Sequence, residues 1–124
     1  MAMGNFRVPV EIATLSGDRF ERLEALVDIG ATYTWVPRDV LDRLGIQPEE
    51  DWPFVLADGR EITYPIASIR VRMNQRSRPT VAVFGEPGTE ALLGAFTLEA
   101  FGLAADPVNH RLLRVPGLLK TVAA

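Results

Sequence analysis

The chain is a succession of short segments in which apolar and polar residues alternate, and glycine or proline closes most of them. Phe6, Val8, Val10 and Ile12 fall on one face of an extended strand, because successive side chains of a strand point to opposite sides. Ten glycines and nine prolines are spread over the 124 residues, which is typical of a fold with many turns. The pattern therefore favours an all-β fold over a helical bundle.

Similar segments account for most of the chain. Strands are expected over residues 20–27, 54–57, 61–64, 66–73, 80–84 and 111–115. An acidic loop is expected over 49–53 and a polar turn over 74–78. Two short helices are predicted over 38–44 and 96–101, each ended by a glycine. With 48% hydrophobic residues the chain can form one core, so we predict a single domain over residues 1–124.

Two stretches of the sequence repeat each other in residue character. Residues 40–46 match residues 97–103, and each stretch covers a predicted helix and the glycine that ends it. An apolar segment followed by Gly-Ala precedes each of them, at 25–31 and at 91–95. We therefore predict an internal pseudo-twofold in which a strand, a Gly-Ala bend and a short helix are used twice.

The composition excludes several kinds of chemistry. With 16 acidic and 13 basic residues, the net charge of −3 gives no overall basic surface for nucleic acid; an arginine-rich stretch at 70–78 is interpreted as a solvated hairpin face. The absence of cysteine excludes thiolate catalysis and Cys-ligated metal sites. His110 is the only histidine, which argues against a Ser-His-Asp triad and His-rich metal sites. We expect no metal and no cofactor, so any chemistry must come from carboxylates.

The sequence also gives expectations about location. No uncharged apolar run is long enough to span a membrane. The first residues lack the apolar core of a signal peptide. We therefore expect a cytoplasmic protein with no membrane partner.

Three motifs occur in an informative order. Residues 26–32 read Leu-Val-Asp-Ile-Gly-Ala-Thr, which resembles the active-site motif of the retropepsin-like aspartic proteases: an apolar pair, then Asp, Thr or Ser, and Gly. Residues 91–94, Ala-Leu-Leu-Gly before a helix, are similar to that family's second signature, and the Asp58-Gly59 hairpin lies where the family has its flap. The resemblance covers residues 6–115, and the segments 31–37 and 103–108 are most similar to small bacterial members.

The resemblance implies a retropepsin-like closed β-barrel or sandwich with ψ-type loops and one or two short helices, acting as a homodimer. It implies that Asp28 is catalytic and that the rest of the active-site loop is Ile29, Gly30, Ala31 and Thr32. The residues implied for the flap and substrate binding are Leu56, Ala57, Asp58, Gly59, Ile62 and Tyr64. Those implied for the second signature, which supports the loop, are Leu92, Leu93 and Gly94.

The chemistry of this motif requires a second acid. An aspartic protease needs two carboxylates that share one proton, one to take a proton from water and the other to polarise the scissile carbonyl. The chain has a single Asp-x-Gly after an apolar strand. We therefore predict a C2 homodimer in which Asp28 of one chain lies beside Asp28 of the other. The predicted substrate is a peptide or protein.

One position departs from the family pattern. Ile29 stands where Thr or Ser normally provides a hydroxyl that hydrogen-bonds to the partner's active-site loop. Losing such a buried hydrogen bond costs about 0.5–1.5 kcal/mol, so the dyad or the dimer is expected to be looser. The alternative interpretation is therefore a catalytically weak or inactive module that binds peptides without cutting them, and a small β-barrel with accidental motifs is a third.

Overall fold

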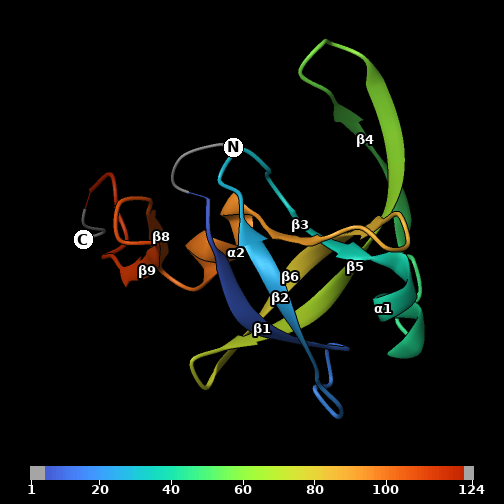
Figure 1. The fold of residues 1–124 in the computed structure, drawn as a ribbon, viewed down its shortest axis with the longest axis horizontal. Coiled ribbons are helices and arrows are strands. Elements are labelled where there is room, and N and C mark those ends of the chain that lie inside the picture. The colour runs from blue at the N-terminus through green and yellow to red at the C-terminus, as the bar shows by residue number, and fades with distance from the viewer. Residues whose placement is uncertain (1–4, 122–124) are drawn as a thin grey trace.

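A computed structural model describes residues 5–121 of the protein. Its elements are β1 Arg7–Ala13, β2 Glu21–Val27, β3 Thr34–Pro37, α1 Arg38–Arg43, β4 Glu50–Val55, β5 Glu61–Met73, β6 Arg76–Gly85, β7 Ala91–Leu93, α2 Ala95–Ala100, β8 Leu103–Asp106 and β9 Arg111–Arg114. Figure 1 shows curved strands around a common centre, with the β4–β5 hairpin projecting on one side and β8–β9 on the other. The chain is mostly strand with two short helices, as predicted.

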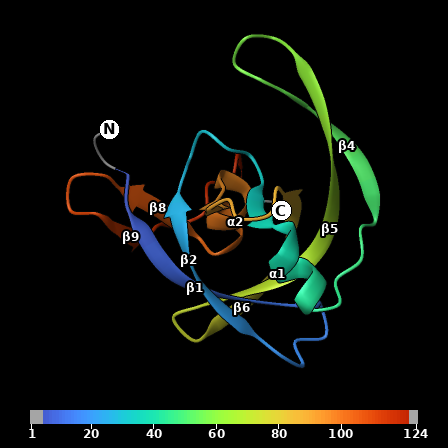
Figure 2. The same cartoon turned by 45° about the vertical axis from the view of Figure 1, so that its right-hand side comes forward.

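Six strands close into a barrel. Neighbouring strands follow the order β1-β2-β7-β3-β6-β5, and a further pairing of β1 with β5 closes the ring. β4 pairs with β5 beyond this ring, so the β4–β5 hairpin continues one wall of the barrel outward (Figure 2). The predicted closed barrel is confirmed.

Two short strands at the centre of the sheet define the internal symmetry. β7 runs parallel to β2, β3 runs parallel to β6, and β3 and β7 meet antiparallel where Trp35 faces Leu92. α1 follows β3 directly and α2 follows β7 directly. The repeated helices are therefore confirmed, but the strand assigned to the first copy was wrong. The strand that precedes α1 is β3, and it corresponds to β7, which precedes α2. Residues 25–27 belong to β2, which the loop over 28–33 separates from β3.

The core lies inside the barrel and under the two helices. The largest fully buried side chains are Phe84, Phe101, Ile12, Leu41, Ile69, Leu93, Val36, Val71 and Thr97. The alternation predicted for the first strand is confirmed, since Val10 and Ile12 are buried. Within residues 5–121, no helix is long and apolar enough to cross a membrane.

Several predicted boundaries were wrong. Residues 50–55 form β4 instead of an acidic loop; the strand lies in a projecting ribbon, so its polar residues remain solvated. Residues 61–73 form one strand through Pro65, because β5 pairs with β4 up to Ile66 and with β6 from Ile66 onward. The predicted turn at 74–78 is restricted to Asn74 and Gln75, both with positive φ. β3 and β8 were not predicted.

An ion pair crosses the seam that closes the barrel. Glu11 of β1 and Arg72 of β5 are register partners, and the two guanidinium nitrogens of Arg72 donate to the Glu11 carboxylate at 2.9 and 2.8 Å. The guanidinium also lies 3.8 Å from the centre of the Phe20 ring. Hydrogen bonding from Arg72 holds the pKa of Glu11 below its ordinary value.

We predict that Glu11→Gln lowers the thermal unfolding midpoint at pH 7 by a few degrees at most. A depressed pKa stabilises the folded state above the ordinary pKa of the group, and this contribution is lost as the pH falls through about 5 to 3. The difference between the variant and the unmodified chain should therefore shrink at pH 3. Glu61→Gln is the control, since no ion pair of Glu61 is found within residues 5–121. An equal difference at both pH values would contradict the prediction.

Candidate functional site

Asp28 begins the loop that follows β2. Its backbone N–H donates to the Leu93 carbonyl at 3.0 Å, which extends the parallel pairing of β2 and β7 by one bond. The Asp28 carboxylate accepts a hydrogen bond from the Gly30 N–H at 3.0 Å, and the Asp28 carbonyl accepts one from Ala31 at 3.1 Å. The side chain is half-buried. The loop therefore fixes one carboxylate at a defined place on the rim of the barrel.

The chain around Gly94 supports this loop from behind. The N–H groups of Ala95 and Phe96 donate to the carbonyls of Ala31 and Thr32, both at 2.9 Å. A Cβ on Gly94 would lie 2.6 Å from the carbonyl carbon and oxygen of Tyr33 and 2.9 Å from the Thr32 oxygen. Backbone cannot yield to such an overlap without shifting, so only glycine allows the loop to lie against α2.

Three buried threonines connect the loop to the core. The Thr97 hydroxyl is hydrogen-bonded to Thr34 at 2.6 Å and to Thr80 at 2.8 Å, and Thr34 also accepts the Gly94 N–H at 3.1 Å. Each of the three is at most 4% exposed. No buried side-chain nitrogen or oxygen in residues 5–121 lacks a hydrogen-bond partner. The network thus ties β3, β6 and α2 together without leaving an unpaired polar atom.

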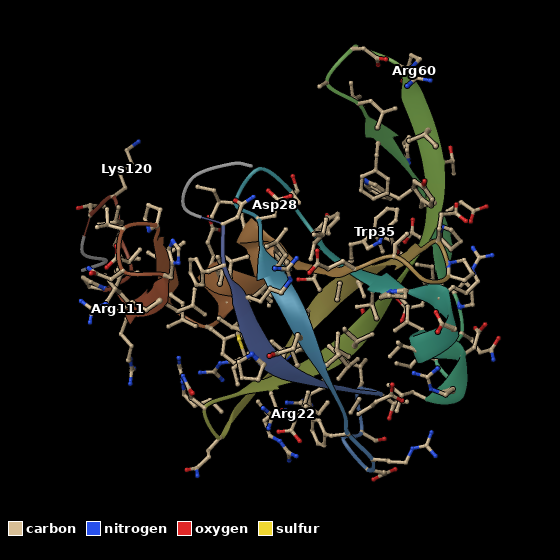
Figure 3. All side chains as sticks on the ribbon, viewed as in Figure 1. Arg22, Asp28, Trp35, Arg60, Arg111 and Lys120 are labelled. Atoms are coloured by element: carbon tan, nitrogen blue, oxygen red, sulfur yellow. The ribbon has the colours of Figure 1, made fainter. Side chains whose placement is uncertain are left out.

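The β4–β5 hairpin forms an arm beyond the barrel. Its tip is closed by a hydrogen bond from Leu56 N–H to the Arg60 carbonyl at 2.8 Å, and Gly59 supplies the positive φ of +89° that the turn requires. Figure 3 shows that the tip, marked by Arg60, lies well apart from Asp28.

The carboxylate of Asp58 at this tip is hydrogen-bonded to Arg60. The Asp58 carboxylate accepts the Arg60 N–H at 3.0 Å and the Arg60 Nε at 2.7 Å. The backbone N–H of Arg60, followed by its side chain, holds the pKa of Asp58 below its ordinary value. Asp58 is therefore an ionised turn residue and does not act as a second acid beside Asp28 in the same chain.

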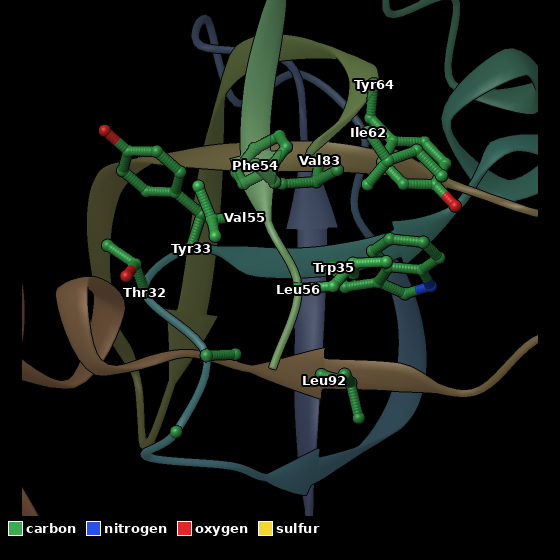
Figure 4. A pocket seen from close by; sticks show the side chains of 12 residues that line it. Thr32, Tyr33, Trp35, Phe54, Val55, Leu56, Ile62, Tyr64, Val83 and Leu92 are labelled. Atoms are coloured by element: carbon green, nitrogen blue, oxygen red, sulfur yellow. The ribbon is translucent and has the colours of Figure 1, made fainter. Parts of the chain in front are cut away.

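A groove of about 230 Å³ lies between the Asp28 loop and the arm. Its lining residues are Gly30, Ala31, Thr32, Tyr33, Trp35, Phe54, Val55, Leu56, Ile62, Tyr64, Val83 and Leu92. Figure 4 shows side chains from both the loop and the arm directed into the same space. The loop and hairpin predicted from separate motifs therefore form opposite walls of one groove.

Aromatic contacts hold the two walls together. Trp35 meets Tyr64 edge-on with ring centres 4.9 Å apart, and Tyr33 meets Phe54 at 6.3 Å. The Trp35 Nε1 donates to the Thr89 hydroxyl at 3.0 Å. In Figure 4 this nitrogen and the hydroxyls of Tyr33 and Tyr64 point away from the centre of the groove. The inner surface is therefore mainly hydrocarbon.

The comparisons with known proteins agree with this geometry. Residues 14–100 match the family model described as gag-polyprotein putative aspartyl protease. The chain belongs to this family of retroviral-type aspartyl proteases. The solution structure of the Simian Foamy Virus (mac) protease is similar, with a TM-score of 0.52 and 21% sequence identity over 74% of this chain and 92% of that chain. At this identity the likeness bears on the fold alone, and it confirms the retropepsin-like fold. No curated protein matches significantly.

Within this family fold the predicted site residues fall into four groups. Those that line the groove are Gly30, Ala31, Thr32, Leu56, Ile62, Tyr64 and Leu92. Ala57, Asp58 and Gly59 form the exposed tip of the arm. Leu93 is fully buried and Gly94 packs behind the loop. Asp28 and Ile29 line a neighbouring hollow of about 270 Å³ rather than the groove itself.

Five residues of the groove were not predicted from the sequence as site residues: Tyr33, Trp35, Phe54, Val55 and Val83. Phe54 is the register partner of Ile62, so the alternation of the predicted hairpin contained a signal for it. Tyr33 follows the motif by one residue and carried no such signal. Trp35 follows the Asp28 loop and lines the groove, and a Cβ on Gly85 would lie 2.1 Å from its Nε1.

No group of three or more His, Cys, Asp or Glu side chains placed to hold a metal ion occurs in the part of the chain that the structure describes. The expectation that the protein works without a metal stays a prediction. The role of Asp28 as the reacting acid likewise stays a prediction.

We predict that Gly94→Ala lowers the free energy of unfolding by about 1–3 kcal/mol, as expected when a side chain is forced against packed atoms. Thermal and urea unfolding would measure the loss. Gly117→Ala is the matched control, because a Cβ there meets nothing within 4 Å and its φ is not positive. Equal unfolding midpoints for the two variants would show that the loop does not depend on the absence of a side chain at residue 94.

Proposed function

We propose that the protein is an aspartic endopeptidase in which Asp28 and the Asp28 of a second copy form the catalytic dyad of a C2 homodimer. The observation that carries the proposal is the position of Asp28. It lies in a loop that is held by hydrogen bonds, beside the groove that the β4–β5 arm covers. The chain belongs to the aspartyl protease family. Each chain supplies one acid, one arm and one groove, so two chains supply a complete site.

The proposed chemistry needs no other group. One carboxylate takes a proton from water, and the oxygen of that water attacks the scissile carbonyl carbon, which the protonated partner carboxyl polarises. The carbon–nitrogen bond then breaks, and a proton passes to the leaving amine. The bent Asp28 loop suits this role because its backbone bonds fix the carboxylate before substrate arrives.

The groove suits an extended peptide. Its floor comes from the loop and from Leu92, and its roof from Leu56, Ile62 and Tyr64. A peptide lying between them would pair with strand edges through its backbone, and the arm would exclude water from the reaction. The backbone of exposed Gly30 would lie against the peptide, because glycine permits close approach. The cytoplasmic location expected from the sequence is part of the same proposal.

We predict that Asp28→Asn lowers the rate of peptide cleavage by at least about 100-fold, the contribution expected of a lost acid–base group. The assay is cleavage of a mixed peptide library followed by mass spectrometry. Asp42→Asn, a change of an exposed aspartate on α1, is the control that should cleave normally. Equal cleavage by the Asp28→Asn variant and the unmodified chain would overturn the proposal.

We predict that cleavage is fastest at acidic to near-neutral pH. Two carboxylates a hydrogen bond apart cannot both ionise easily, so the active state holds one proton between them and is lost when that proton leaves. A pH–rate profile of kcat/KM tests this. A maximum above about pH 8 would be incompatible with a shared-proton dyad.

A peptide-binding module without activity is the second candidate, and Ile29 is the observation that favours it. The position that normally carries a hydroxyl in this family is aliphatic here. If the unmodified chain and Asp28→Asn are equally inert while both dimerise and bind peptides, this candidate replaces the protease.

A further inference from the structure

Ile29 is an aliphatic side chain left exposed at the most constrained part of the site. It follows Asp28 directly, and 68% of its surface is accessible in the single chain. Its neighbours in sequence are fixed by the bonds of Gly30 and Ala31 to Asp28. Ile29 thus points outward from a turn that is closed by these two hydrogen bonds.

A hollow lies beside Ile29 on the same face. It measures about 270 Å³ and is lined by Asn5, Phe6, Val27, Asp28, Ile29, Ala105 and Pro107. Most of these side chains are apolar. The space is large enough to accept a side chain of the size of isoleucine from another molecule.

The proposed dyad fixes where a second copy must lie. If two Asp28 carboxyls come within a hydrogen bond, the adjacent residues are carried to the same twofold axis, because neighbouring Cα atoms are about 3.8 Å apart. A residue beside the axis of an isologous interface meets its own counterpart or that counterpart's surroundings. An exposed isoleucine in this position is therefore covered when the dimer forms.

We propose that Ile29 is the main apolar contact between the active-site loops of the homodimer, packing against Ile29 and the neighbouring hollow of the second copy. This inference rests on the proposed dyad. The apolar contact takes the place of the hydroxyl bridge that Thr or Ser makes in this family, so the aliphatic residue strengthens the dimer instead of loosening it. The occupant of the hollow is a second copy of this chain.

Truncating the side chain tests the contact. Ile29→Ala removes three carbons from each copy and should weaken the dimer by about 10- to 100-fold in Kd, whereas Ile29→Val removes one and should change Kd less than about 10-fold. Sedimentation equilibrium measures Kd. Because Ile29 is exposed, the fold of each variant should persist, and circular dichroism checks it.

Leu15→Ala provides the matched control. Leu15 is an aliphatic residue that is 46% exposed, and it lies in the connection between β1 and β2, at the opposite end of β2 from Asp28. Its truncation removes comparable apolar surface from a place away from the proposed axis, so Kd should not change. A Kd for Ile29→Ala equal to that of Leu15→Ala would overturn the inference.

Cross-linking tests the geometry without relying on affinity. The chain contains no cysteine, so Ile29→Cys introduces a single thiol. Two such thiols bridge only when their Cα atoms are about 4.4–6.8 Å apart. Mild oxidation should give a covalent dimer of Ile29→Cys and none of Leu15→Cys. No covalent dimer of Ile29→Cys at concentrations where the unmodified chain is dimeric would count against the contact.

The outcomes separate this inference from the proposed function. If the unmodified chain dimerises and cleaves peptides but Ile29→Ala dimerises equally well, the dyad stands and the Ile29 contact is wrong. If the unmodified chain stays monomeric at every concentration and does not cleave, both are wrong. Dimerisation that depends on Ile29 without any cleavage supports the contact and favours the binding module.

Discussion

The whole site depends on one close contact between two stretches of backbone. The loop over 28–33 lies on the start of α2 at a distance that leaves no room for a side chain at Gly94. This approach lets two N–H groups of α2 bond to the loop and lets Thr34 accept the Gly94 N–H. The position of Asp28 is therefore set by the barrel and does not rely on the arm.

The buried threonines make this contact specific. A hydroxyl inside a core is costly unless it is paired, and Thr34, Thr80 and Thr97 pair with one another and with the backbone. Sliding β3 against β6 by one residue would break the network and turn each side chain to the opposite face. The register that places Asp28 is thus fixed by polar as well as apolar packing.

The sequence predicted most of what arises from local pattern. The alternation of the first strand, the glycine ends of both helices and the Asp58-Gly59 hairpin each have a local physical cause, and the structure contains all three. Only Phe54 and Val55 of β4 were predicted as strand, because the acidic residues and the proline that precede them are typical of a loop. The role of Tyr33 in the groove could not be predicted, because it follows from the contact of β3 with a hairpin distant in the sequence.

The continuous strand β5 has a mechanical consequence. Its 13 residues run from the arm through the barrel wall. The arm and the barrel wall are therefore parts of one continuous strand and are not joined by a flexible hinge. Displacing the arm must bend or twist β5 near Pro65, where its pairing changes from β4 to β6. Movement at the roof of the groove is thereby converted into strain in the barrel wall, and the stiffness of that wall opposes it.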